Sequence, residues 1–221
     1  MTAHDDPADA HLLVVAKAPE PGRVKTRLAV DIGNLAAAEV AAAALLDTMA
    51  ACVAAVGAQH CHLALAGDLD LAVDGAAIKR ALAGWTVRPQ RGDRFADRLV
   101  HAHADVPGPV VQVGMDTPQV TPAQLRAAAA ALAEHDAALG PAADGGWWVL
   151  ALRDPDAAQA LADVPMSTES TFDDTRAALE ARGLQVTIVD RLRDVDTSAD
   201  AGAVWATAPR TRFAAVWGRQ A

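Results

Sequence analysis

The feature that most constrains the fold is the stretch Leu12–Leu28, an apolar run followed by a loop rich in proline and basic residues. The run Leu12–Ala16 is apolar and largely β-branched, which is typical of a strand buried on both faces of a parallel sheet. Pro19 and Pro21 cannot join a strand ladder, so the strand is expected to end near Lys17. The stretch therefore predicts a sheet of the α/β type with a loop at the strand's carboxyl end.

Four basic side chains crowd this loop. Ligands of open α/β sheets bind beyond the carboxyl ends of the strands. Cations this close together repel one another unless an anion joins them, and the whole chain carries a net charge of -9. We therefore predict a polyphosphate site and set it against the alternative of a solvated basic loop. The cations are Lys17, Arg23, Lys25 and Arg27.

The segment Gly22–Thr26 is close to the end of a P-loop motif but does not complete it. Val24 stands where that motif needs its second glycine, and no glycine lies four positions earlier. We therefore expect long side chains, more than a backbone cradle, to hold the phosphates. A second basic loop with a glycine, residues 88–92, adds two candidates. The full nucleotide-binding set is Lys17, Gly22, Arg23, Lys25, Thr26, Arg27, Gln90 and Gly92.

Composition narrows the class of protein. The chain has 221 residues, enough for one large domain with a substantial core. Its negative charge argues against a general nucleic-acid binder. Its two cysteines give no disulfide or zinc pattern. The apolar runs fall short of a membrane span and the N-terminus does not look like a signal peptide, so we expect a cytoplasmic protein without a membrane partner.

Alternating patterns along the chain predict a mostly parallel, Rossmann-like sheet with helices on both faces. The predicted single domain covers residues 11–206, between a disordered tail at 1–10 and a C-terminal tail at 207–221. Besides the first strand, we expect strands at 60–66, 85–87, 109–113, 136–139, 148–152 and 184–189. We expect helices at 34–56, 76–82, 93–104, 121–134, 155–162 and 172–181, and a last one starting at 197.

Asp116 follows a predicted buried strand, beside Thr117 and Pro118. The proline stiffens the loop that carries this carboxylate. Magnesium keeps several waters and needs only one or two protein carboxylates when phosphates supply further oxygens. We predict that Asp116 binds a divalent cation, Mg²⁺ or Mn²⁺. The alternative of a capping role is weak because Thr121 already caps the next helix.

A second candidate is Asp144, followed by Gly145 and Gly146, where glycine lets backbone approach a ligand closely. The alternative is a plain hairpin turn, since Asp-Gly is a common hairpin signal. Trp147 and Trp148 come next, and because neighbouring strand residues face opposite sides, one should pack in the core while the other could line a pocket. Asp144 is thus a candidate for catalysis and for the metal. Gly145, Gly146, Trp147 and Trp148 are candidates for the acceptor.

Two histidine pairs and one acidic run are weaker candidates. His101 and His103 lie in a predicted helix, where residues two apart do not share a face. His60 and His62 do share a strand face, but no third metal ligand is evident. The acidic run 194–200 is interpreted mainly as a capping box, which leaves Asp194 or Asp196 a smaller chance of reaching the site.

Several of these motifs together resemble a bacterial family of GT-A-fold proteins in the nucleotide-diphospho-sugar transferase superfamily, often labelled glycosyltransferases. The resemblance covers roughly residues 12–206, and Lys25–Leu28 is also similar to an element of the more distant 2-phospholactate guanylyltransferases. The matching motifs are Lys17–Pro19, Gly22–Leu28, Asp47-Thr48, Gly92-Asp93, Arg98-Leu99, Gly114–Pro118, Gly140-Pro141, Asp144–Gly146 and Asp194–Thr197.

The resemblance implies a nucleotide donor and a divalent metal near Asp116. The chain departs from the family at Trp147 and Trp148, where tyrosines are usual, at Met166, where tryptophan is common, and at 95–96. These departures lie where an acceptor could bind, so the acceptor transfers least well.

Three functions follow as expectations. The first is Mg²⁺-dependent nucleotidyl transfer from a nucleoside triphosphate to a small anionic acceptor, with Asp116 and Lys25 as catalytic residues. The second is glycosyl transfer from a nucleotide-sugar, with Asp144 as base. The third is a catalytically weak nucleotide-binding protein on the same fold. The sequence leaves open whether Asp144 or Asp196 is the second metal ligand.

Overall fold

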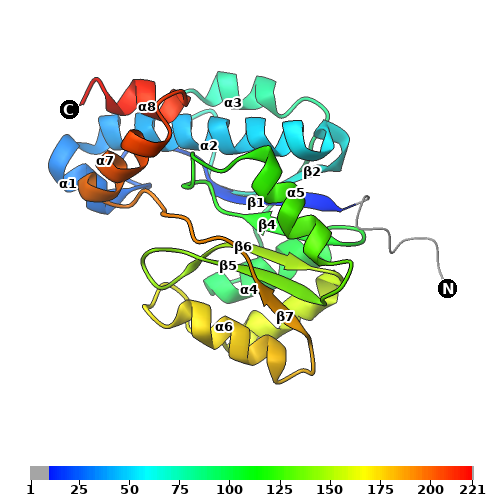
Figure 1. The fold of residues 1–221 in the computed structure, drawn as a ribbon. Coiled ribbons are helices and arrows are strands. Elements are labelled where there is room, and N and C mark those ends of the chain that lie inside the picture. The colour runs from blue at the N-terminus through cyan, green and yellow to red at the C-terminus, as the bar shows by residue number, and fades with distance from the viewer. Residues whose placement is uncertain (1–9, 221) are drawn as a thin grey trace.

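A computed structural model describes residues 10–220 (Figure 1). The predicted N-terminal tail covers residues 1–10, and residues 1–9 of it lie outside the described part. The strands are β1 (His11–Lys17), β2 (Cys61–Ala66), β3 (Thr86–Pro89), β4 (Val110–Val113), β5 (Ala137–Pro141), β6 (Trp147–Leu152) and β7 (Val186–Ile188). The helices are α1 (Thr26–Ile32), α2 (Asn34–Val56), α3 (Gly75–Ala81), α4 (Phe95–Ala104), α5 (Pro122–Ala131), α6 (Thr171–Glu180), α7 (Ser198–Thr207) and α8 (Arg212–Trp217), with 3₁₀ helices η2 (Ala58–His60) and η3 (Pro155–Asp163).

The strands form one sheet in the order β3-β2-β1-β4-β6-β5-β7. β1 lies near the middle and pairs in parallel with β2 and with β4. β6 runs antiparallel to both β4 and β5, because β5 and β6 form a hairpin, and β7 returns parallel to β5. The predicted mostly parallel, Rossmann-like single domain is confirmed, and the carboxyl ends of β1 and β4 meet at one edge of the sheet.

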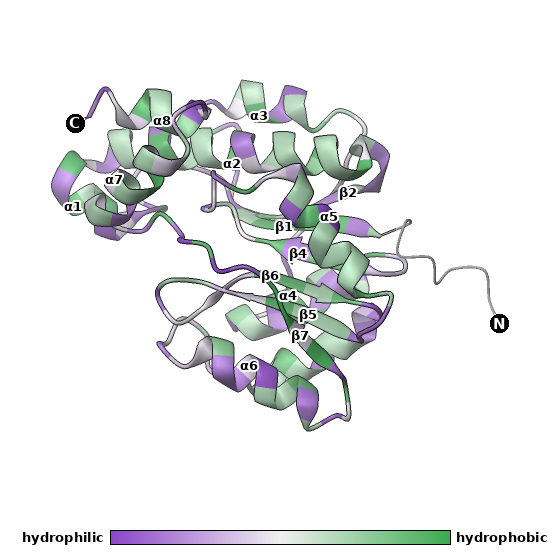
Figure 2. Ribbon diagram, viewed as in Figure 1, coloured by the Kyte–Doolittle hydropathy of each residue, from purple (hydrophilic) through white to green (hydrophobic). Residues whose placement is uncertain are grey.

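Two hydrophobic clusters cover the two faces of the sheet. One contains apolar residues of α2, α3 and α5, and the other those of α4, η3 and α6. β1 contributes to both, with Val14 on one side and Val15 on the other, as expected for a strand buried on both faces. Figure 2 shows the hydrophobic colour concentrated on the strands and on α2 and α5.

α2 is the long alanine-rich helix, and its predicted bounds are confirmed. Gly33 precedes its first turn and Gly57 follows its last. By length and composition alone it is apolar enough to cross a membrane, which the sequence analysis does not anticipate. More than half of its most apolar stretch is buried inside the protein, so α2 is a core helix of this fold.

The C-terminal residues 207–221 are not the tail expected from the sequence, because they contain α8. Phe213 is fully buried in a third cluster that also holds Leu28, Val40 and Val204. The carboxylate of Asp47, on α2, accepts hydrogen bonds from the backbone N–H groups of residues 212 and 213. α8 therefore belongs to the folded unit.

Helix caps agree with the sequence at two places and differ at a third. Thr121 and Thr197 each accept a hydrogen bond from the backbone N–H three residues later, and each forms the predicted capping box. α4 begins at Phe95, two positions after the start expected at 93. Its N-cap is Arg94, and the Asp97 carboxylate accepts from the Arg94 backbone N–H.

Candidate nucleotide-binding site

A cavity of about 440 Å³ opens at the carboxyl edge of the sheet. Its walls come from segments far apart in the sequence: the loops after β1 and β4, the β5–β6 hairpin, residues 166–168 before α6, and residues 194–196. Figure 1 shows the segment from β7 to α7 crossing the molecule between the two groups of helices. The cavity therefore lies where ligands of open α/β sheets bind.

Lys25 is the centre of the charged end of this cavity. Its side chain is 7% exposed, and its Nζ donates to Asp116 Oδ2 and to Asp196 Oδ1, each at 2.7 Å. Burial lowers the pKa of the lysine, but the two carboxylates raise it by more, so the ammonium stays charged. Lys25 also has a left-handed backbone, φ 46°, a strained conformation for a residue with a Cβ. Such strain occurs often at functional sites.

Asp116 reaches Lys25 because Gly114 leaves space for its side chain. A Cβ built at Gly114 would lie 2.7 Å from Asp116 Oδ1. The loop is also fixed to β1, since the Lys17 backbone N–H donates to the sulfur of Met115 at 3.3 Å. Asp116 is predicted from the sequence, but no role is predicted for the glycine two residues earlier.

Asp194 and Asp196 lie in the segment between β7 and α7, far along the chain from Lys25 and Asp116. The Val195 backbone N–H donates to the Asp116 carbonyl at 2.9 Å, which seats this segment beside the β4 loop. The Leu192 N–H donates to Pro141 O at 3.1 Å and fixes the approach of the segment. The capping box beginning at Thr197 is real, yet both preceding aspartates line the cavity. The structure therefore has both the capping box and the two aspartates at the cavity.

Asp194 is the most perturbed carboxyl of the cavity. Burial, together with the negative charges of Asp116, Asp144 and Asp196, raises its pKa to about 9 against the opposing effect of Lys25. Its Oδ1 is enclosed and has no hydrogen-bond partner within residues 10–220. A buried oxygen without a donor is a costly arrangement that a cation or a ligand donor would relieve.

All four predicted cations line this one cavity, together with Thr26 and Gln90. The Gln90 amide donates to Ala16 O at 2.9 Å and Ala64 O at 3.0 Å, which holds it across the ends of β1 and β2. Gly22 and Gly92 are predicted for the site but do not line the cavity. A Cβ at Gly92 would meet Asp97 Cβ at 2.7 Å, so this glycine permits close packing of the loop against α4.

Of the site residues predicted in the β5–β6 hairpin, some line the cavity and others do not. Asp144, Gly146 and Trp147 line the cavity, and Gly145 and Trp148 do not. Trp148 is 2% exposed and its indole N–H donates to Asp190 O at 2.7 Å, so its expected acceptor role is wrong. A Cβ at Gly145, φ 92°, would lie 2.2 Å from Glu169 O, which shows that this glycine serves backbone packing. The Asp144 carboxylate accepts from the Gly146 N–H at 2.9 Å and also shapes the turn.

The donor chemistry of the site fits a divalent metal that prefers oxygen ligands. Asp116 and Asp196 converge on one cation, the Lys25 ammonium, and Asp194 adds the enclosed oxygen. Across residues 10–220 no three His, Cys, Asp or Glu side chains are placed to hold one ion. That arrangement is compatible with magnesium, which keeps waters and takes one or two protein carboxylates.

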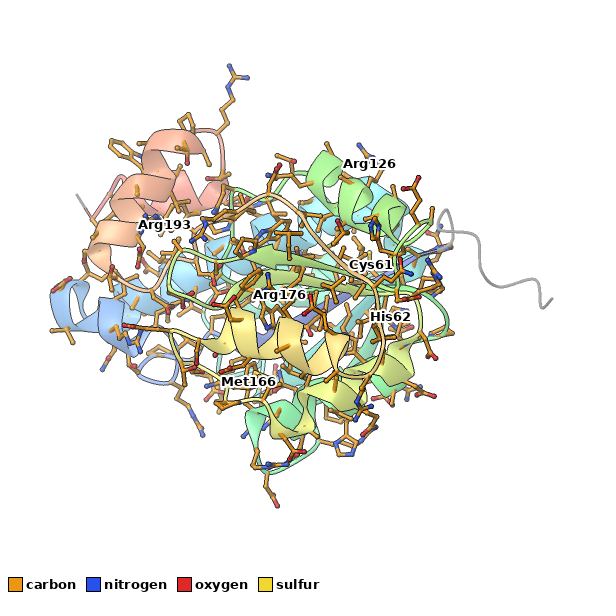
Figure 3. All side chains as sticks on the ribbon, turned by 60° about the horizontal axis from the view of Figure 1, so that its bottom comes forward. Cys61, His62, Arg126, Met166, Arg176 and Arg193 are labelled. Atoms are coloured by element: carbon orange, nitrogen blue, oxygen red, sulfur yellow. The ribbon has the colours of Figure 1, made fainter. Side chains whose placement is uncertain are left out.

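The histidine pairs lie elsewhere. His60 and His62 gather with His11 near the start of β1, where His11 Nδ1 and His62 Nε2 are 2.8 Å apart. Figure 3 shows Cys61 and His62 to the right of Met166 and Arg193 in that view. His103 is fully buried in α4 and its Nδ1 contacts Leu99 O.

Gln112 lines the cavity although it is not among the site residues predicted from the sequence. Gln112 lies inside β4, in a run that we interpret only as a buried strand, and it is 3% exposed while lining the cavity. The polar residue in an otherwise apolar strand, VVQV, is the one sign that could have identified it.

The fold has relatives among solved structures. A protein of Desulfovibrio desulfuricans G20, provisionally described as a nucleotide-diphospho-sugar transferase, is 26% identical with a TM-score of 0.84, over 96% of this chain and 94% of that chain. A CMP:2-keto-3-deoxy-manno-octonic acid synthetase complexed with CTP is 16% identical (TM-score 0.52; 90% and 98% covered). A Mycobacterium tuberculosis H37Rv protein in complex with manganese is 21% identical (TM-score 0.52; 88% and 97% covered).

The first of these relatives confirms the resemblance to nucleotide-diphospho-sugar transferases, and the last two support the fold alone. No match was found among curated proteins. A bacterial family profile matches residues 45–168, more than half of the chain. The chain therefore belongs to the family described as "Uncharacterized protein conserved in bacteria (DUF2064)".

Proposed function

We propose that this protein is a divalent-metal-dependent nucleotidyltransferase, which joins a nucleoside monophosphate unit to a small anionic acceptor and releases pyrophosphate. The observation that carries the proposal is the position of Lys25, a buried ammonium between two carboxylates, with three more cations around the same cavity. Nucleotidyl transfer needs this kind of preorganised positive charge where phosphate charge develops.

The positions of the other three cations favour a triphosphate. Arg23 and Arg27 have side chains that are 75% and 73% exposed, and each has only a weak partner, at 3.4 and 3.9 Å. The Lys17 ammonium has no hydrogen bond or ion pair with any other side chain in the described part of the chain. Beyond its diphosphate a nucleotide-sugar continues as an uncharged sugar, whereas a triphosphate continues as further charged phosphate. Lys17, Arg23 and Arg27 would attract the additional negative charge of a triphosphate more strongly than an uncharged sugar.

In the proposed reaction, an acceptor oxygen attacks the α-phosphorus and the bond from that phosphorus to the bridging oxygen of the β-phosphate breaks. Lys25 holds the reacting phosphate, and Lys17, Arg23 and Arg27 neutralise the pyrophosphate as it leaves. Asp116 and Asp196 would hold the metal, Mg²⁺ or Mn²⁺, which supplies Lewis-acid stabilisation of the phosphoryl oxygens. The acceptor is already an anion and so needs no general base. We place it at the hairpin side, near Asp144, Gly146 and Trp147.

Glycosyl transfer is the second candidate, and the description of the Desulfovibrio relative favours it. In that reaction an uncharged hydroxyl acceptor would need a base, and Asp144 is exposed at the cavity wall. A catalytically weak nucleotide binder is the third candidate function.

Two further proposals accompany the main one. The functional unit extends past residue 206 through α8, and the protein acts in the cytoplasm, with which its two buried free cysteines are compatible.

The test is a direct assay. The protein is incubated with each nucleoside triphosphate, Mg²⁺ or Mn²⁺ and a panel of phosphorylated and carboxylated acceptors, and pyrophosphate is measured. We expect pyrophosphate with at least one pair, and none from the Asp116→Asn variant. Turnover of a nucleotide-sugar with no pyrophosphate from any triphosphate would establish glycosyl transfer in its place. Nucleotide binding without either product would leave the third function.

A further inference from the structure

Gln112 is the only fully buried, uncharged polar side chain within residues 10–220 that both lines the cavity and leaves an enclosed oxygen without a partner. It lies in β4 at the centre of the sheet, in register with Leu13 of β1 and Leu150 of β6. Both neighbours are buried apolar residues of the face covered by α4 and α6. No part of the proposed reaction uses this amide.

A buried amide oxygen without a donor is costly, and an apolar residue of the same size would avoid the cost. The amide sits on the cavity wall and its Nε2 is not enclosed, so a ligand in the cavity can pair with the amide nitrogen. This differs from the other glutamine of the wall, Gln90, whose amide already donates to Ala16 O and Ala64 O. The Gln112 amide thus has no hydrogen-bond partner within residues 10–220, and its Nε2 is not enclosed while its Oε1 is.

The position of Gln112 decides which part of a ligand it meets. It lies four residues before Asp116, at most about 13 Å along an extended strand, toward the inside of the sheet. On the same face of the sheet, Val15 of β1 lies two residues past Leu13 and also lines the cavity, as does Phe95 at the start of α4. The phosphates belong at the charged end, near Lys25, and the acceptor at the hairpin side, near Asp144 and Trp147. The remaining part of a nucleotide is its base, which is flat, uncharged and edged with donors and acceptors.

We infer that Gln112 is a specificity-determining residue that hydrogen-bonds the edge of the nucleobase, an inference that rests on the proposed function. A carboxamide offers a donor and an acceptor side by side, the pattern with which glutamine pairs to a base edge. The amide nitrogen Nε2, which is not enclosed, donates to an acceptor atom of the base edge, and Val15 and Phe95 offer apolar contacts to the base.

The test separates base from phosphate. Wild type and Gln112→Leu are titrated calorimetrically, in the presence of Mg²⁺, with ATP, CTP, GTP, UTP and inorganic tripolyphosphate. Leucine keeps the approximate size and removes the amide. We expect the affinity for the preferred nucleotide to fall about tenfold or more. The affinity for tripolyphosphate should stay unchanged. The differences in affinity among the four nucleoside triphosphates should become smaller.

Two controls complete the design. Gln59→Leu makes the same change at an exposed position in η2 and should leave every affinity unchanged. Gln112→Met, also of similar length, replaces the leucine variant if that variant fails to fold. An unchanged nucleotide affinity, or an equal loss for tripolyphosphate, would overturn the base contact while leaving the proposed function standing. Wild-type protein that binds tripolyphosphate but no nucleotide would refute the proposed function itself.

Discussion

The strongest prediction concerns the buried ammonium. Lys25→Met keeps an unbranched side chain of similar length and removes the charge that Asp116 and Asp196 share. Removing one partner of a fully buried ion pair costs about 3–5 kcal/mol. Here the two carboxylates keep 29% and 36% side-chain exposure, so water screens the charges left behind. We therefore expect a loss of about 1–3 kcal/mol in the free energy of unfolding, measured by urea denaturation without added metal.

The matched control is Lys79→Met. Lys79 also forms an ion pair, with Asp70, but both side chains are largely exposed, and such pairs contribute less than about 1 kcal/mol. Adding Asp196→Asn to Lys25→Met should recover part of the lost stability, because it removes one unpaired carboxylate. Equal losses in the two lysine variants, or no recovery in the double variant, would refute the view that Lys25 balances the partly buried negative charge of Asp116 and Asp196.

Other changes test single parts of the site and the fold. Gly114→Ala places a Cβ within 2.7 Å of Asp116 Oδ1, so it should displace that carboxylate and weaken Mg²⁺-dependent nucleotide binding at least tenfold while the protein remains folded by circular dichroism. Asp116→Asn should abolish the metal dependence of nucleotide binding in calorimetry, and an unaltered metal response would count against the assignment. Arg27→Ala, at a 73% exposed side chain, should weaken triphosphate binding with less than about 0.5 kcal/mol of lost stability. Phe213→Ala should cost about 3–5 kcal/mol in denaturation because α8 packs into a core cluster, and a change below about 1 kcal/mol would restore the view of a C-terminal tail.

Local patterns in the sequence are sufficient for most elements of the fold. The apolar run of β1, the alanine-rich α2 between Gly33 and Gly57, and the caps at Thr121 and Thr197 are all short-range signals. Each depends on interactions within a few residues, and such interactions are readable from sequence. The tail expected after residue 206 fails for the opposite reason. α8 is six residues long and is stabilised by its contacts with α2, which no local pattern records.

The candidate site divides along the same line. The sequence by itself determined that a basic loop follows a buried strand and that Asp116 ends another, because position at a strand end is a local property. Only the tertiary structure decided that Lys25 pairs with Asp196, 171 residues away, and that Asp194 and Gln112 face the same cavity. It also decided that Trp148 packs in the core while Trp147 meets the cavity. These contacts depend on strand order and on the path of the segment between β7 and α7, which place residues side by side without leaving a pattern in the local sequence.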